Sequence, residues 1–132
     1  MSSYTGHQLA ASLTSAGIPT LLIPDSSVHA LVSRCTKLVI GAHSVLANGG
    51  VFSLAGSLAT VLAARSFAKP VVVLSGQFKF APVWNSYHEY SAVDFQGPDS
   101  VIGHRDCHRL EVVDPYYDYI RPELVNLFVT NE

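Results

Sequence analysis

His43 is the residue of this sequence best placed to take part in chemistry. It follows Leu38–Gly41, an apolar run of strand length, and open α/β sheets bind ligands beyond the carboxyl ends of their strands. No carboxylate stands close to His43 in the sequence, so the alternative is a polar side chain that only lines a crevice.

A glycine-rich bend, Asn48-Gly49-Gly50, precedes the longest predicted helix. Backbone N–H groups in such a bend can bind a phosphate at the start of a helix. Neither the G-x-G-x-x-G motif of dinucleotide sites nor the G-x-x-x-x-G-K-S/T motif of nucleoside triphosphate sites occurs in the chain. Two interpretations stay open: an anion-binding turn, or glycines that only turn the chain.

Two further patterns resemble reactive sites only in part. His104–His108 contains an H-x-x-C-H cluster, but a structural zinc takes four ligands and the other cysteine, Cys35, lies far upstream. Ser75-Gly76 follows a predicted strand without the G-x-S-x-G elbow that activates a serine nucleophile. We therefore expect the cluster to be a surface loop, and we expect no catalytic residue, no metal and no cofactor.

Aromatic side chains near the end of the sequence form a candidate interface, because tyrosine is enriched where proteins meet. The residues are Tyr116, Tyr117, Tyr119 and Phe128. The alternative for the tyrosines is packing over a sheet edge with their hydroxyl groups in water.

The elements that must position these residues alternate between helices and strands. Helical spacing covers Gly6–Ala16, a short helix runs from Val28 to about Cys35, and the longest helix spans about Val51 to Phe67. Apolar runs predict strands at Thr20–Ile23, Lys37–Gly41 and Val71–Leu74. Continuous apolar strands separated by helices predict an open, mostly parallel, Rossmann-like α/β sheet with helices on both faces.

The regularity is lost between residues 81 and 108, which we interpret as a long irregular excursion of the kind that often carries function. Order returns with a strand at Leu110–Asp114, a helical turn at Arg121–Val125 and a closing strand at Leu127–Thr130.

The composition favours a single domain with a real core and some apolar surface. The chain has 132 residues, of which 48% are hydrophobic and 14% are charged, against about 25% charged in ordinary soluble domains. We expect the excess apolar surface to meet another subunit. The net charge is −2 and the eight basic residues are scattered, which argues against nucleic acid as a partner.

The sequence shows no disulfide framework, signal peptide or membrane span, and these three features bear on where the protein is found in the cell. Two cysteines make no disulfide framework, no signal peptide begins the sequence, and no apolar run reaches the ~20 residues of a membrane span. We expect a cytoplasmic protein with no membrane partner.

The order of these segments resembles a known family. Leu38–Gly50, Gly56 with its alanine-rich helix, and Pro70–Val73 are similar to the Rossmann-like domain shared by regulatory subunits of eukaryotic translation initiation factor 2B and related sugar-phosphate isomerases. Tyr117–Asn131 resembles the regulatory subunits in particular. Within them, Thr5–Ala10, Ser33-Arg34 and Phe78-Lys79 point to the beta type. The resemblance covers nearly the whole chain; only residues 81–108 align loosely.

The chain departs from the isomerases where their chemistry is done. They carry a catalytic aspartate at the position of His43, and an asparagine–lysine pair for the substrate phosphate at the positions of Ser53 and Leu54. Leu54 supplies neither a cation nor a hydrogen bond. The remaining backbone scaffold implies a vestigial crevice, made of His43, Asn48, Gly49, Gly50, Ser53 and Gly56.

The family also places further chain before this region. Relatives precede it with a helical N-terminal domain and the first strands of the sheet, and this sequence begins at about the helix after those strands. We therefore expect residues 1–132 to be the C-terminal Rossmann-like domain, a fragment without the family's first strands and upstream helical domain.

The resemblance implies a non-enzymatic role in the guanine-nucleotide exchange complex that reloads initiation factor 2. The expected partners are the other subunits of the initiation factor 2B complex and initiation factor 2, with self-association when the chain is alone. The alternatives are a methylthioribose-1-phosphate or ribose-1,5-bisphosphate isomerase and a free-standing small-molecule-binding module.

Overall fold

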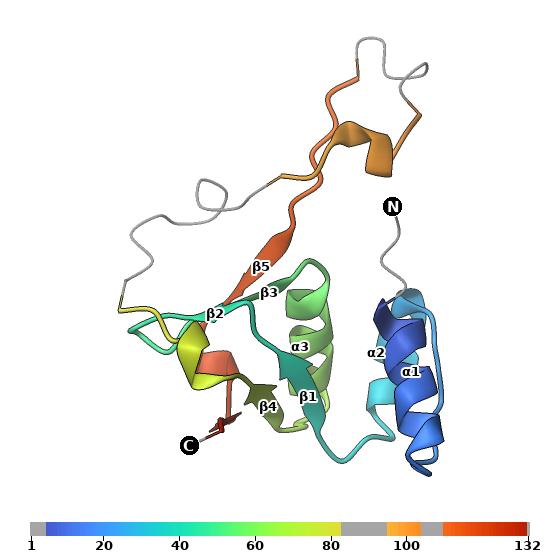
Figure 1. Ribbon diagram of the computed structural model, residues 1–132, viewed down its shortest axis with the longest axis vertical. Coiled ribbons are helices and arrows are strands. Elements are labelled where there is room, and N and C mark those ends of the chain that lie inside the picture. The colour runs from blue at the N-terminus through green and yellow to red at the C-terminus, as the bar shows by residue number, and fades with distance from the viewer. Residues whose placement is uncertain (1–4, 83–94, 104–109, 132) are drawn as a thin grey trace.

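The computed structural model describes residues 5–82, 95–103 and 110–131 (Figure 1). Its helices are α1 (Thr5–Ser15), α2 (Val28–Val32) and α3 (Ser57–Ser66), with single 3-10 turns η1 (Asp25–Ser27), η2 (Gln77–Lys79), η3 (Pro98–Ser100) and η4 (Pro122–Leu124). Its strands are β1 (Leu38–Gly41), β2 (Ser44–Val45), β3 (Val51–Leu54), β4 (Val71–Leu74), β5 (Tyr117–Ile120) and β6 (Leu127–Val129). No described helix is long and apolar enough to cross a membrane.

A parallel sheet forms the part of the fold that the sequence predicted best. Its strand order is β1-β4-β6, and all of its pairings are parallel. The register aligns Ile40 with Val73 and Val73 with Phe128. The strands predicted at residues 37–41, 71–74 and 127–130 are confirmed, because β-branched and other large apolar residues favour a strand, and the helical turn predicted at 121–125 is confirmed as η4. Helices on both faces of this sheet are not found among the described residues, since one of its faces is exposed.

A second, antiparallel sheet of order β2-β3-β5 corrects the prediction for Val51–Leu54. We expected these residues to begin the long helix, but they form β3, and the helix starts only after Gly56 at φ +95°. β-branched and aromatic residues favour a strand, and β3 has a partner: Val51 pairs with Ile120 and Phe52 with Tyr119. The candidate tyrosines Tyr117 and Tyr119 thus lie in a strand, β5.

Two other predicted strands are wrong. Thr20–Ile23 and Leu110–Asp114 are assigned no strand, and Leu21, Leu110 and Val113 are exposed. A strand is stable only beside a hydrogen-bonded neighbour, and no described strand lies against either segment. Asp25-Ser26-Ser27, directly before α2, forms the 3-10 turn η1, and neither η1 nor α2 has a side-chain cap bond.

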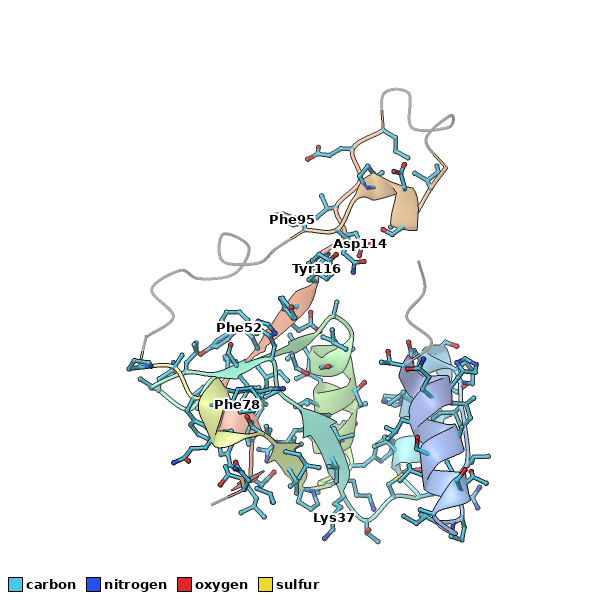
Figure 2. All side chains as sticks on the ribbon, viewed as in Figure 1. Lys37, Phe52, Phe78, Phe95, Asp114 and Tyr116 are labelled. Atoms are coloured by element: carbon cyan, nitrogen blue, oxygen red, sulfur yellow. The ribbon has the colours of Figure 1, made fainter. Side chains whose placement is uncertain are left out.

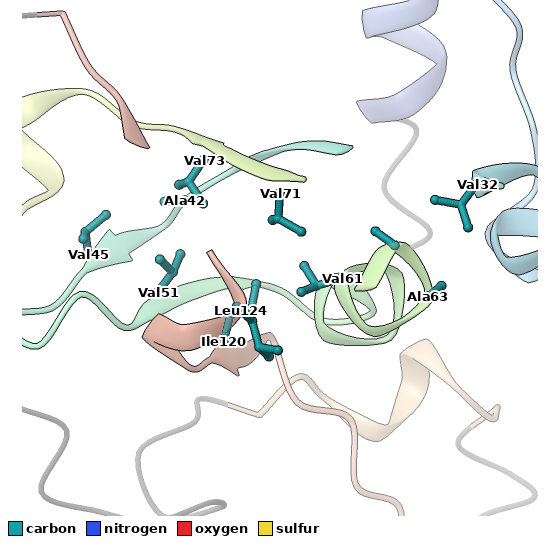
Figure 3. Packing of buried hydrophobic residues seen from close by; sticks show 11 residues of the cluster. Val32, Ala42, Val45, Val51, Val61, Ala63, Val71, Val73, Ile120 and Leu124 are labelled. Carbon is teal, nitrogen blue, oxygen red and sulfur yellow. The ribbon is translucent and has the colours of Figure 1, made fainter. Parts of the chain in front are cut away.

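The core lies between the parallel sheet, α3 and the antiparallel sheet (Figure 3). Val71 and Val73 of β4 face it, and their solvent exposure is 0%. From the other elements, Val51, Val61, Ala64 and Ile120 are equally buried. On the opposite face of the parallel sheet, Val39, Leu74, Leu127 and Val129 are exposed.

An arm, residues 95–103 and 110–116, projects from the body as the continuation of β5 (Figure 1). Its two limbs are joined where Phe95 bridges Pro115 and the N–H of Gln96 donates to the Asp114 carbonyl at 2.7 Å. The Ser100 hydroxyl also reaches a carboxylate oxygen of Asp114.

Candidate functional site

His43 lies directly beyond β1, as predicted, but its ring is engaged by an aromatic neighbour. Its N–H donates to the Phe52 carbonyl at 2.7 Å. Its imidazole stacks on the Tyr117 ring, with centroids 4.2 Å apart and planes inclined by 25°. The structure therefore brings a predicted crevice residue, exposed in the loop before β2, into contact with a predicted interface residue, half-buried in β5.

The Asn48-Gly49-Gly50 bend is a hairpin turn between β2 and β3. Its polar groups form hydrogen bonds with other groups of the chain. The N–H of Gly49 donates to the Leu46 carbonyl at 2.9 Å, and the N–H of Gly50 donates to Asn48 Oδ1 at 2.9 Å. Asn48 Nδ2 donates to the Tyr119 hydroxyl at 3.1 Å. These donors are directed into the chain, which favours the interpretation that the glycines turn it.

Glycine is required at two positions of this turn. Gly49 has φ +82°, in the left-handed region that glycine adopts without steric cost. At Gly50 the constraint is contact, because a Cβ atom there would overlap the Tyr119 ring. Tyr119 thus packs against the turn, half-buried, and its hydroxyl group accepts a hydrogen bond from Asn48.

Ser53 and Leu54 occupy the positions where the related isomerases hold a phosphate, and they face opposite ways. Ser53 is 4% exposed, and its hydroxyl donates to the Gly41 carbonyl at 2.8 Å and lies 3.0 Å from the Ser57 hydroxyl. Leu54 is 59% exposed. The serine links the two sheets at the end of β1, and the leucine presents an apolar side chain outward.

The start of α3, beside Gly56, is already occupied by a carboxylate. Asp118 Oδ2 accepts hydrogen bonds from the N–H groups of Gly56 at 2.8 Å and Leu58 at 2.9 Å. A negative group at a helix N-terminus satisfies free N–H donors and interacts favourably with the helix dipole. Asp118 therefore takes the position that an anionic ligand would use.

Sequence reasoning missed Asp118 and Lys79. Capping side chains normally stand immediately before their helix, whereas Asp118 comes from a strand about sixty residues later, so no local signal marks it. Lys79 Nζ donates to the Ala42 carbonyl at 2.7 Å and fastens the turn after β4 to the loop after β1. Only the folded arrangement reveals either contact.

The candidate interface residues separate into two places. Phe52, Leu54, Tyr117 and Tyr119 share the outer face of the second sheet, and Phe52 and Tyr119 have ring centroids 5.5 Å apart. Tyr116, at the base of the arm, lies 5.9 Å from Tyr117 by the same measure (Figure 2). Phe128 lies elsewhere, on β6, where its ring faces Phe80.

Two hollows flank these residues. One, of about 430 Å³, is apolar and lies between the β2–β3 turn and the Phe80 and Phe128 rings. The other, of about 1050 Å³, runs between α3 and the segment around η1, and it reaches the base of the arm at Tyr116 and Gln96. His43 and Asn48 line neither hollow.

Metal binding has no support from the part of the chain that the structure describes. There, no three His, Cys, Asp or Glu side chains are grouped so that they could hold an ion. The H-x-x-C-H cluster at residues 104–108 lies outside the described residues.

Comparison with known proteins adds a family and a fold. The model of the initiation factor 2 subunit family (IF-2B) matches residues 3–132. The chain is 41% identical over 128 residues to translation initiation factor eIF2B subunit beta of Schizosaccharomyces pombe, covering 95% of this chain and 32% of that protein. It spans about a third of the length of the curated relatives it matches.

Solved structures agree with this result. The tetrameric eIF2B-beta2-delta2 complex from C. thermophilum matches with a TM-score of 0.66 and 27% identity, covering 97% of this chain and 36% of that one. The 5-methylthioribose 1-phosphate isomerase of Pyrococcus horikoshii has a TM-score of 0.72 and 17% identity, covering 86% of this chain and 33% of that one. The isomerase likeness shows a shared fold, and the predicted α/β class is confirmed.

Proposed function

Because the chain belongs to the initiation factor 2 subunit family, we propose that it is a regulatory domain of a beta-type subunit in the translation initiation factor 2B complex. In that role it supports assembly of the complex and control of guanine-nucleotide exchange on initiation factor 2. Its partners are the other subunits of the complex and initiation factor 2, and its site of action is the cytoplasm.

The observation that carries this proposal is the 41% identity to an eIF2B beta subunit across 95% of the chain. The alignment runs over nearly the whole chain, so it supports a role shared by this region of the two proteins. The eIF2B-beta2-delta2 structure, a complex of beta and delta subunits, supports a delta-type subunit as the direct partner.

The residues at the crevice support a role without catalysis. The isomerases' aspartate position holds His43, whose ring stacks on Tyr117, and their lysine position holds the exposed Leu54. An isomerase needs an acid–base group and a cation within reach of its sugar phosphate. The N–H groups at the start of α3 are the remaining donors that could bind a phosphate, and they are already hydrogen-bonded to the Asp118 carboxylate.

The test is binding to a purified delta-type subunit. The tagged chain is immobilised beside full-length S. pombe beta subunit as positive control and an unrelated α/β protein of similar size as negative control. We expect the chain to retain the delta-type subunit above the negative control. If the folded chain, checked by circular dichroism, retains none while the full-length subunit does, the proposed role of this domain is wrong.

A further inference from the structure

Asn48 is the one asparagine of the sequence that is followed by glycine. Its side-chain amide stands next to a backbone nitrogen that no side chain shields, because glycine has no Cβ atom. In an unfolded chain such a pair deamidates on its own, and asparagine counts among the thermolabile residues of proteins. The hydrogen bonds around Asn48-Gly49 in the folded turn decide how the same reaction proceeds in the native protein.

Deamidation of this pair is a rearrangement of the main chain followed by hydrolysis. The backbone nitrogen of Gly49 attacks Asn48 Cγ, so that a bond forms between them and the bond from Cγ to Nδ2 breaks. Nδ2 leaves as ammonia and takes with it the hydrogen that the Gly49 nitrogen loses. Water then opens the cyclic succinimide at Cγ, which gives aspartate, or at the main-chain carbonyl of residue 48, which gives isoaspartate.

The folded turn holds both of the nitrogens that must change partners. The N–H of Gly49 donates to the Leu46 carbonyl at 2.9 Å, and this hydrogen is lost when the ring closes. Asn48 Nδ2, the leaving nitrogen, donates to the Tyr119 hydroxyl at 3.1 Å. Asn48 Oδ1 accepts the N–H of Gly50 at 2.9 Å, which fixes the orientation of the amide. Ring closure therefore breaks two of these three hydrogen bonds.

The Tyr119 hydroxyl is itself held in place by the second sheet. Tyr119 pairs with Phe52 in the ladder between β3 and β5, and their ring centroids are 5.5 Å apart. The Tyr119 ring also packs against Gly50, which is buried. The amide of Asn48 is thus fastened to β5 as well as to its own turn, and it is released only when the turn separates from β5.

We propose that Asn48-Gly49 is a site of covalent self-modification, a deamidation site gated by the β2–β3 turn. The closed turn protects the amide, and each opening of the turn exposes it to attack by the Gly49 nitrogen. Native proteins open locally at free energies below that of global unfolding. The converted fraction therefore grows with the number of openings. This site is independent of the proposed function.

The two products have different consequences for the turn. Aspartate at position 48 keeps an oxygen for the Gly50 N–H, and the Tyr119 hydroxyl can rotate to donate to the other oxygen. Isoaspartate adds a methylene group to the main chain before Gly49. The turn cannot absorb this length by moving Gly50, which is buried against the Tyr119 ring. We therefore expect the isoaspartyl form to lose the hairpin.

Ageing the chain at physiological temperature and pH tests the gate. Peptide mapping by mass spectrometry follows conversion at Asn48, and Asn126, which leucine follows, is the internal control. We expect Asn48 to convert at least about tenfold more slowly in the folded chain than in the chain unfolded in guanidinium chloride, because two hydrogen bonds must break first. Equal rates in the folded and unfolded chain, or no conversion at Asn48 in either, would overturn the proposal.

Two tyrosine variants test the contact with Nδ2. Tyr119→Phe removes only the hydroxyl that holds the leaving nitrogen and should speed conversion in the folded chain about fivefold, the usual effect of one hydrogen bond. Tyr117→Phe, in the same strand, changes a ring that stacks on His43 and should leave the rate unchanged. Circular dichroism verifies that both variants are folded. Equal rates in the two would contradict the gate, and the comparison of folded with unfolded chain decides the matter if Tyr119→Phe does not fold.

The consequence for the turn is measured on converted chains. The chain is aged while unfolded and then refolded, and Asn48→Asp is taken through the same treatment as the matched control for damage elsewhere. We expect the isoaspartyl-containing chain to unfold at a lower urea concentration than Asn48→Asp. Equal urea midpoints would show that the turn accepts isoaspartate, against the proposal. None of these measurements involves a delta-type subunit, so this proposal and the proposed function fail separately.

Discussion

At the scale of single residues, Asp118 joins strand β5 to the start of a helix about sixty residues earlier in the sequence. Its carboxylate accepts two backbone N–H groups at the start of α3. Asp118→Ala leaves both donors without this acceptor and should lower the free energy of unfolding by about 1–2 kcal/mol. Urea denaturation measures the loss.

The control for Asp118 is Glu123→Ala. Glu123 pairs with Arg121 at 3.3 Å, but both side chains are mostly exposed, and such pairs contribute little to stability. A loss at Glu123 equal to that at Asp118 would contradict the capping role.

The contact between Gly50 and Tyr119 makes a second residue-scale prediction. Gly50→Ala places a methyl group against the hydroxyl end of the Tyr119 ring, closer than van der Waals contact allows, and should destabilise the fold by about 1–3 kcal/mol, the usual cost of overpacking. In a Tyr119→Ala background the same substitution should cost little, because the clash is gone. Gly97→Ala, where no atom lies near the added Cβ, is the control. A cost at Gly50 that persists without the tyrosine ring would refute this contact as its cause.

The residues at the candidate crevice predict that the chain has no sugar-phosphate isomerase activity. With His43 stacked on Tyr117 and a leucine at the phosphate position, we expect no isomerase turnover on methylthioribose 1-phosphate or ribose 1,5-bisphosphate. A coupled assay with a bacterial isomerase as positive control measures it. Turnover above about 1 s⁻¹, within the ordinary enzyme range, would exclude the non-enzymatic assignment.

At the scale of elements, β3 shows how a distant partner decides between a helix and a strand. Its sequence, Val-Phe-Ser-Leu, stands directly before α3, and Leu54 and Leu58 have the spacing of a helical stripe. The strand forms because β5, about sixty residues away in the sequence, provides its ladder. Such long-range pairing leaves no local trace.

Core substitutions distinguish the two accounts of this element. Ile120→Ala removes a fully buried partner of Val51 and should cost about 2–5 kcal/mol. Leu54→Ala changes an exposed side chain and should stay within about 0.5 kcal/mol. In the helical account Leu54 faces the core, so a large cost there would contradict the strand. Thermal unfolding of both variants provides the comparison.

The elements that the sequence did predict share a physical property. β1, β4 and β6 are continuous apolar runs, and α3 carries alanines and leucines at helical spacing, so their conformation follows from local composition and burial. The position of His43 beyond β1 follows from the same local signal, because only Ala42 separates it from that strand. The cap at Asp118, the anchor at Lys79 and the ladder between β3 and β5 all join distant segments, and one sequence holds no record of those contacts.

At the scale of the whole molecule, low charge sets how the chain behaves in solution. With 14% charged residues and a sequence pI of about 6.3, little repulsion separates copies near that pH. We expect solubility to be lowest near pH 6.3 and to rise toward pH 8 as net negative charge grows. Precipitation titrations at fixed ionic strength test this. A solubility unchanged across that range would mean that charge does not limit association.

The pairing of early strands with late ones has a consequence for synthesis on the ribosome. β3 pairs with the later strand β5, and β4 pairs with the later strand β6. Asn126, next to β6, also forms two hydrogen bonds with Val71 of β4. Neither sheet can close until residues 117–129 have left the exit tunnel, and contacts between such distant segments form slowly. Until then the nascent chain exposes unpaired edges of the kind that chaperones protect from aggregation.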